Sequence, residues 1–225
     1  MIGYIVITGI LSLVGMVISN RLKRKFAYYS KMPVKSGKSG RDIAETMLQH
    51  YDVHDVQILE GRGMLTDHYN PLKKTVVLSP DVYHGRSIAA AAVAAHECGH
   101  AIQHANAYTW LQLRSAIVPV VNIAAKAQQF LLYFALGAIG VGGNSTILLI
   151  TIATFAITAL FSFITLPVEF DASQRALAWL DDSNELGTVE HDGAKDALWW
   201  AAMTYVSAAL SALVILLYLI LRSRN

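Results

Sequence analysis

Residues 87–105 read SIAAAAVAAHECGHAIQHA, and this stretch decides the fold of the chain. Strong helix formers fill it, no proline interrupts it, and Ser87 is a suitable residue to begin a helix. We therefore expect a single helix. Because residues four apart lie on the same face of a helix, His96 and His100 should project together. Gly99, the one helix-weakening residue, predicts the close approach of another element beside the histidines.

This helix carries the pattern of a catalytic zinc site. His96-Glu97-x-x-His100 supplies two imidazole ligands, and zinc in such sites takes a third protein ligand and keeps an open position for water. Glu97, one residue further round the helix, can reach that water and act as general base. The alternative is a chance occurrence of the motif, which would leave Glu97 unexplained on an apolar, alanine-rich helix. The motif therefore predicts Zn²⁺-dependent hydrolysis.

Cys98 is the only cysteine, so an internal disulfide is impossible, as suits a reducing compartment. Its place inside the motif also allows an interpretation as a metal ligand. On a helix, however, Cys98 points roughly 200° away from His96, so a small packing residue is the favoured interpretation.

The composition is that of a membrane protein. The 225 residues are 54% hydrophobic and only 15% charged, with a mean hydropathy of +0.42, well above that of an ordinary soluble domain. Apolar segments long enough to span a bilayer cover residues 2–20, 144–166 and 197–221. Because no small-residue cleavage site follows the first, we expect a retained helix rather than a removed signal peptide.

A fourth apolar segment, residues 116–141, is weaker because polar residues interrupt its first half. It is either a span whose polar stripe faces protein or a helix that begins in the cytoplasmic part and ends in the membrane. We expect it to form a hairpin with residues 144–166, joined by Gly142-Gly143. Without this hairpin, His96 and His100 would lie on the opposite side of the membrane from the residues after 166, where a third metal ligand is expected.

Basic residues directly after the first span set the orientation. Eight of the 18 Lys and Arg residues lie between Arg21 and Arg41, and the positive-inside rule places such a run in the cytoplasm. A polybasic run can also bind nucleic acid, but beside a membrane span the anionic lipid leaflet is the commoner partner. The N-terminus is then outside, and the helix of residues 87–105, called the metal helix below, is cytoplasmic. The last span leaves Arg222 and Arg224 outside, against the rule.

A small αβ unit is expected between the first span and the metal helix. Ser39-x-x-Asp42 is a capping box before a short amphipathic helix. Residues 53–59 and 74–78 are typical of strands. The region 65–78 is our candidate for an edge strand that pairs with an extended substrate.

Two further histidines are candidates for supporting roles. His104 continues the helical row one turn after His100, and is either a supporting or substrate-facing group of the metal site or a hydrogen-bonded structural residue. His68 lies in a polar loop before a turn-forming Asn70-Pro71, where a structural role is the more usual one, although loops beside a site often carry function.

The third ligand is expected in residues 166–173, at the end of the apolar segment 144–166. Pro167 should stop or kink the membrane helix, and a new helix that begins with acids would let Glu169 lean over the metal helix. The alternative is that Glu169 and Asp171 only stabilise a helix N-terminus. The other acids of this region lie in a polar loop without comparable anchoring: Asp181, Asp182, Glu185, Glu190 and Asp192.

Several motifs in order give the chain a family resemblance: residues 67–71, 78–87, 96–104 and 166–173. Together they resemble the YugP-type neutral zinc metallopeptidases, which are bacterial integral membrane proteins more distantly similar to the HtpX membrane proteases. The resemblance covers nearly the whole chain.

The resemblance implies a gluzincin arrangement, in which His96, His100 and Glu169 bind zinc and Glu97 is the general base. HtpX-type enzymes carry an Asp four residues after the ligand Glu, whereas this chain has Ser173 there, and its Asp171 follows the Glu by two residues. The sequence therefore does not decide which residue hydrogen-bonds the metal ligands and orients them.

We predict a mainly α membrane protein with about four transmembrane helices and a small cytoplasmic α+β zincin-like domain that carries the metal helix. The expected units are a transmembrane helix (1–20), the zincin-like domain (21–114), a transmembrane hairpin (115–166), a cytoplasmic segment with the third zinc ligand (167–196) and a C-terminal transmembrane helix (197–225).

The predicted function is that of a multi-pass endopeptidase of the inner or plasma membrane, which uses Zn²⁺ to cleave peptide or protein substrates, membrane proteins among them, at the cytoplasmic face. A further donor for the oxyanion is expected from Arg175, Tyr205 or His104. Two alternatives stay open. One is a site-2-type intramembrane metalloprotease, which the polar residues directly after the motif disfavour. The other is a non-catalytic zinc-binding membrane adaptor, in which Cys98 could close the site.

Overall fold

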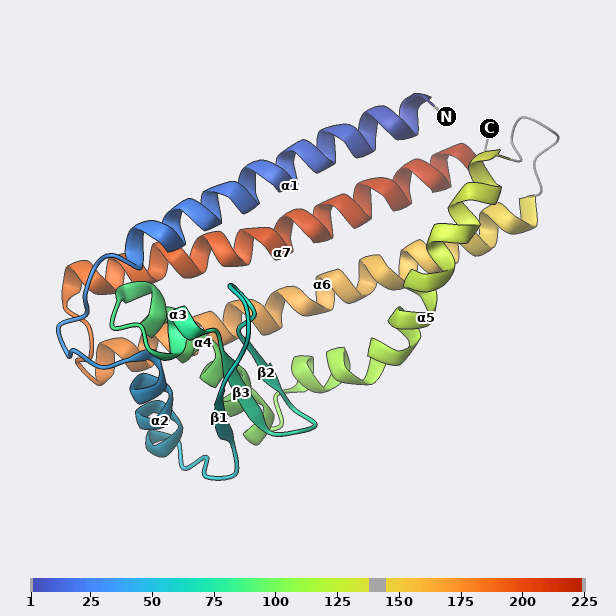
Figure 1. The fold of residues 1–225 in the computed structure, drawn as a ribbon. Coiled ribbons are helices and arrows are strands. Elements are labelled where there is room, and N and C mark those ends of the chain that lie inside the picture. Colours follow the sequence, from blue (N-terminus) through green and yellow to red (C-terminus); the bar gives the residue numbers. More distant parts are fainter. Residues whose placement is uncertain (1, 138–144, 224–225) are drawn as a thin grey trace.

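The computed structural model describes residues 2–137 and 145–223 (Figure 1). The chain is mainly helical, and α1, α7 and α6 run side by side, with the short helices and the strands gathered at the end far from the N-terminus. The prediction of about four membrane-length helices is confirmed. Within the described residues, four helices are long and apolar enough to cross a membrane: α1 (Ile2–Tyr29), α5 (Thr109–Gly137), α6 (Ser145–Asp182) and α7 (Thr188–Ser223).

The predicted capping box starts α2 (Gly40–His50). The Asp42 N–H donates to the Ser39 hydroxyl oxygen at 3.2 Å, and the Ser39 N–H donates to the Asp42 carboxylate at 2.9 Å. Two donors at the helix start are thereby satisfied. The apolar face of α2, with Ile43 and Met47 fully buried, packs into the core against α4.

A three-stranded sheet in the order β1-β3-β2 follows α2. β1 runs parallel to β3, and β2 runs antiparallel to it, so β1 and β2 are the two edges. A single turn of helix, α3, leads on to the metal helix. The bounds are β1 (Gln57–Glu60), β2 (His68–Asn70), β3 (Thr75–Leu78) and α3 (Pro80–Tyr83).

Two strand predictions need correction. The strand expected at residues 53–59 occupies only 57–60, because the preceding Asp52 has a left-handed φ of 57° and Val53 turns into the core. The loop expected around His68 is the edge strand β2, which is stabilised by pairing with β3 rather than by its own composition.

α4 (Ile88–Ala105) is the central element of the αβ part and packs against α2, α6 and α7. The Ala90 N–H donates to the Ser87 hydroxyl oxygen at 3.2 Å, which caps the predicted start. A Cβ added to Gly99 would lie 2.6 Å from the Ala172 carbonyl oxygen. The close approach predicted at Gly99 is therefore confirmed, and the element that approaches is α6.

Cys98 lies on the other side of α4, in the core. Its sulfur is 3.7 Å from the Ala44 carbonyl oxygen of α2, and its complete burial raises the pKa of the thiol. A neutral, buried thiol of this kind is a packing residue rather than a thiolate ligand. The packing role predicted for Cys98 is confirmed.

α6 continues as one helix through Pro167, so the expectation that this proline stops the helix is wrong. A proline removes one intrahelical hydrogen bond, and packing of α6 against α4, α5 and α7 offsets that loss. Glu169 and Asp171 therefore lie inside a helix, and the alternative that they serve a helix N-terminus is wrong. The other acids are only partly in a loop: Asp181 and Asp182 end α6, and Glu190 and Asp192 open α7.

α5 begins at Thr109, before the expected start of the fourth apolar segment, and contains Pro119. One of its polar residues faces protein: Gln128 Nε2 donates to the Thr154 carbonyl oxygen at 3.0 Å and to the Thr158 hydroxyl at 2.8 Å, both on α6. Asn122 and Lys126 are exposed. These bonds favour the first of the two alternatives for this segment. The expected turn at Gly142-Gly143 lies outside the described residues.

Candidate metal centre

His96, His100 and Glu169 come together where α4 packs against α6. One potential ligand atom of each lies within 4.8 Å of the other two. Glu169 Oε2 is 3.4 Å from His96 Nε2 and 3.6 Å from His100 Nε2. The two histidines share a face of α4, as their spacing predicts, and the long helix α6 brings the carboxylate to them.

The Nδ1 atom of each imidazole, on the side of the ring away from Glu169, lies within hydrogen-bond distance of a neighbouring side chain. Ser173 Oγ is 3.1 Å from His96 Nδ1, and Gln103 Oε1 is 3.0 Å from His100 Nδ1. An acceptor at Nδ1 keeps the proton on that nitrogen, which leaves Nε2 free to bind a cation. The sequence alone did not say which residue hydrogen-bonds the proposed metal ligands, and at His96 that residue is Ser173.

Gln103 is itself fixed by a buried network. Its Nε2 donates to the Val168 carbonyl oxygen at 2.8 Å and to Asp171 Oδ2 at 2.7 Å. Asp171 also accepts from Arg175 Nε at 2.6 Å, and the guanidinium carbon of Arg175 lies 5.8 Å from the centre of the Tyr108 ring. Asp171 and Arg175 therefore support the imidazole of His100 through Gln103. Helical spacing of three residues from His100 was the signal that could have found Gln103.

One oxygen of the Glu169 carboxylate lies near the two imidazoles without a hydrogen bond to either. Oε2 is shielded from solvent and makes no hydrogen bond with any residue in 2–137 or 145–223. A buried carboxylate in that state is costly, and a cation placed between it and the imidazoles would remove the cost. Burial alone would lower the pKa of His100, but the Glu169 carboxylate outweighs it and raises that pKa. The site therefore favours positive charge.

These residues fit zinc. Two imidazole nitrogens and one carboxylate oxygen are the three protein ligands of many catalytic zinc sites, which keep a fourth position open. The uncompensated Glu169 oxygen and the two Nε2 atoms turned toward it supply that donor set.

A cleft of about 280 Å³ adjoins the cluster. Glu97, only 8% exposed, lines it beside the two histidines. Tyr205 of α7 also lines it, whereas Arg175 and His104, the other two oxyanion donors considered, do not. The remaining lining residues come from the β2 segment, α5 and α6: Asp67, His68, Tyr69, Pro71, Leu111, Arg114, Ser115, Val118 and Glu169.

Arg114 is a residue of this cleft that sequence reasoning missed. Its Nη1 is 3.9 Å from Glu169 Oε1, and its buried Nε makes no hydrogen bond with any described residue. The guanidinium therefore has donors to offer to a bound molecule. A lone cation at the start of an apolar helix was the signal that could have indicated it.

The edge strand β2 forms one wall of the cleft. It pairs with β3 on one side, and no other described strand pairs with its second edge. The Tyr69 hydroxyl is 2.8 Å from His104 Nδ1, and burial raises the pKa of Tyr69 to about 12, so the hydroxyl stays protonated. His104 thereby takes the hydrogen-bonded structural role and holds β2 against α4.

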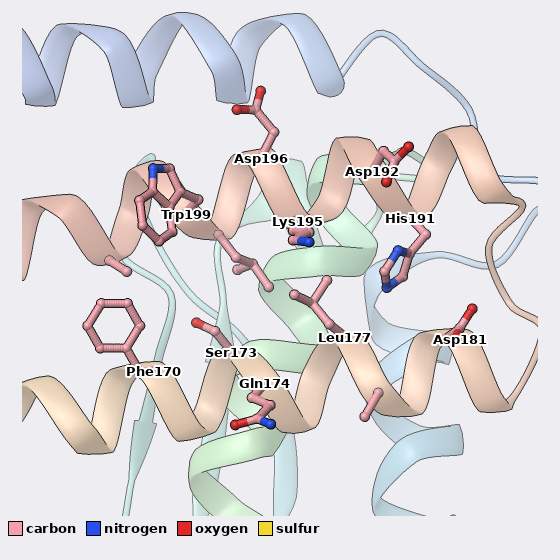
Figure 2. A pocket seen from close by; sticks show the side chains of 13 residues that line it. Phe170, Ser173, Gln174, Leu177, Asp181, His191, Asp192, Lys195, Asp196 and Trp199 are labelled. Atoms are coloured by element: carbon pink, nitrogen blue, oxygen red, sulfur yellow. The ribbon is translucent and has the colours of Figure 1, made fainter.

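A larger cavity of about 700 Å³ lies between α6 and α7 (Figure 2). Figure 2 shows His191 and Asp181 at one end of it, and Phe170 and Trp199 at the other. Ser173, which supports His96, is in its wall, but the three residues of the metal cluster are not. The candidate metal centre is therefore the smaller cleft.

A family model described as "Putative neutral zinc metallopeptidase" matches residues 4–224. The chain therefore belongs to this family of zinc metallopeptidases, whose name implies zinc and a peptide or protein substrate. It is 41% identical over 199 residues to the "Putative membrane protease YugP" of Bacillus subtilis (strain 168), an alignment that covers 88% of this chain and 86% of that protein. No solved structure matches the chain. The family resemblance drawn from the four motifs is confirmed.

Proposed function

We propose that this protein is a membrane-integral zinc endopeptidase that hydrolyses peptide bonds at the cytoplasmic face of the membrane. The cluster of His96, His100 and Glu169, with Glu97 in the same cleft, is the observation that carries the proposal. Membership of the zinc metallopeptidase family supports the same chemistry.

His96, His100 and Glu169 are the proposed zinc ligands. A zinc ion held there supplies a Lewis acid that polarises the scissile carbonyl and makes water a stronger acid. Ser173 and Gln103 orient the two imidazoles, so the ligands need little reorganisation.

Glu97 is the proposed general base. Its carboxylate accepts a proton from the attacking water and returns it to the leaving amine nitrogen, so the products separate as neutral amine and acid before ionising. Tyr205 and Arg114 are the proposed donors for the negative charge that develops on the carbonyl oxygen, because both line the cleft. An extended substrate would pair with the free edge of β2, which forms a wall of the same cleft.

The candidate metal centre lies close to the polar ends of the long helices, which supports action at the membrane surface. The Arg21 guanidinium lies 5.6 Å from the centre of the Trp200 ring, and Lys25 pairs with Asp196 at 2.6 Å. These pairs mark the polar ends of α1 and α7. Tyr205 is little more than one turn further along α7, so the cleft lies near this boundary and not at mid-membrane. The small sheet beside the cleft also favours a surface site over a site-2-type intramembrane one.

Elemental analysis of the purified protein tests the ligand set. We expect about one zinc ion per chain in the wild type and a marked loss in Glu169→Ala. The matched control is Asp182→Ala, which removes an exposed carboxylate from the end of the same helix and should leave the zinc in place. Full zinc retention by Glu169→Ala would refute the ligand set.

Glu97→Gln tests the catalytic role separately. The variant should keep its zinc and lose the cleavage of a fluorogenic peptide library, because an amide cannot accept the proton. Wild-type levels of cleavage by Glu97→Gln would refute the general-base assignment.

A further inference from the structure

A second cleft, of about 1140 Å³, lies on the cytoplasmic side of the proposed topology, at the end of α1. It is bounded by the last turns of α1, by the loop between β1 and β2, and by the turn that leads into α4. Phe26, Met64 and Leu65 supply an apolar wall, and Lys23, Lys31 and Arg86 supply positive charge. Asp81 is the only acid that lines it, so the cleft has a net positive charge.

The two lysines of this cleft differ from other basic residues of the same segment. Lys25 pairs with Asp196 and Lys38 pairs with Glu185, both within 4 Å. In contrast, Lys23 and Lys31 form no ion pair with any residue in 2–137 or 145–223. Their charge is therefore available to an anionic ligand.

The cleft also lies at the level of the membrane surface. Lys23 is between Arg21 and Lys25, whose contacts with α7 mark the polar end of the apolar helices. Met64 is 72% exposed and Leu65 44% exposed in the loop that forms the apolar wall. Large apolar side chains exposed beside unpaired cations, at the end of a membrane helix, suit an amphipathic ligand with a negative polar group.

We propose that this cleft binds the headgroup of an anionic phospholipid, with Lys23 and Lys31 facing its phosphate and Met64 and Leu65 contacting the start of its acyl chains. The inference rests on α1 crossing the membrane, as in the proposed function, but not on the peptidase chemistry. The loop that forms the apolar wall leads directly into Asp67 and β2, which line the proposed catalytic cleft. A bound lipid would therefore also hold that cleft at a fixed distance from the membrane surface.

Native mass spectrometry in detergent tests this site, with phosphatidylglycerol and phosphatidylcholine of the same acyl chains as probes. The wild type should bind phosphatidylglycerol about tenfold more tightly than phosphatidylcholine. Lys23→Gln/Lys31→Gln should lose most of that preference. Arg24→Gln/Lys35→Gln removes the same charge from exposed residues of the same segment that do not line the cleft, and it should keep the preference.

Two results would overturn the assignment. One is an equal loss in both double variants, or no preference in the wild type, because a general surface charge would then explain the binding. The other is displacement of the lipid by excess glycerol 3-phosphate, which would mean that the cleft recognises phosphate alone. Gel filtration and the unfolding temperature establish that the variants are folded. Zinc content, measured on the same preparations, should be unchanged, so a failure of this proposal is distinct from a failure of the metal site.

Discussion

Gly99→Ala should damage the metal centre without touching any proposed ligand. The added Cβ would lie 2.6 Å from the Ala172 carbonyl oxygen and 3.1 Å from the Ala172 Cα. Ordinary van der Waals contact begins near 3.4 Å, so α6 must move away from α4 by roughly 0.8 Å. Because both atoms belong to backbone, no side-chain rotation relieves the clash.

The displaced part of α6 carries Glu169, one turn before Ala172. Zinc–ligand distances tolerate only about 0.2 Å, so the displaced carboxylate would no longer meet both histidines. Overpacking of this kind costs about 1–3 kcal/mol. If the zinc-bound state carries that cost, zinc binding weakens by roughly fivefold to 150-fold.

The assay is competition for zinc with a chromophoric chelator, together with thermal unfolding. Gly9→Ala is the matched control, since nothing lies within 4 Å of its added Cβ and Gly9 is also inside a helix. An unchanged zinc affinity and unfolding temperature in Gly99→Ala would refute the reasoning that the close approach of the two helices sets the geometry of the site.

Three other variants test separate parts of the structure. Ser173→Ala should weaken zinc binding by about tenfold in the same chelator assay, because His96 loses its partner. Arg114→Ala should lower kcat/KM for peptides by about tenfold or more while zinc content stays normal, since Arg114 lines the cleft and is a proposed donor to the oxyanion. Ser39→Ala should destabilise the fold by about 1 kcal/mol in urea unfolding. Hydrogen bonds from Ser39 lower the pKa of Asp42. The bond from the Ser39 hydroxyl to the Asp42 carboxylate is therefore fully stabilising above the ordinary aspartate pKa and is lost as the pH falls through the lowered one. The stability difference between the wild type and Ser39→Ala should narrow in acid without closing, because the bond from the Asp42 N–H to the Ser39 hydroxyl does not titrate.

The parts of the fold that could be predicted are those whose cause is local. The alanine-rich run before His96 and the Ser39 capping box each specify a helix through their own residues, and the spacing of His96 and His100 places both on one face. Glu169 could be proposed as the third ligand because it follows a membrane-length segment that was expected to return to the same side. None of these inferences needs a contact between distant residues.

What the sequence left unpredicted depends on tertiary contacts. β2 has only three residues and turn-forming neighbours, and it exists because β3 offers a partner. α6 continues through Pro167 in a helix that packs against α4, α5 and α7, and those contacts are not encoded next to the proline. A cation at the start of an apolar helix marks Arg114 as unusual, but only the packing of α5 beside α6 brings it to the site.

The division of the proposed ligands between α4 and α6 bears on how the enzyme is made. A ribosome completes α4 long before it reaches Glu169, and that residue lies in a helix of membrane-spanning length and composition. The nascent chain therefore carries two histidines and a base but no finished centre. If the chain is the peptidase proposed above, its activity could begin only once α6 has been placed beside α4.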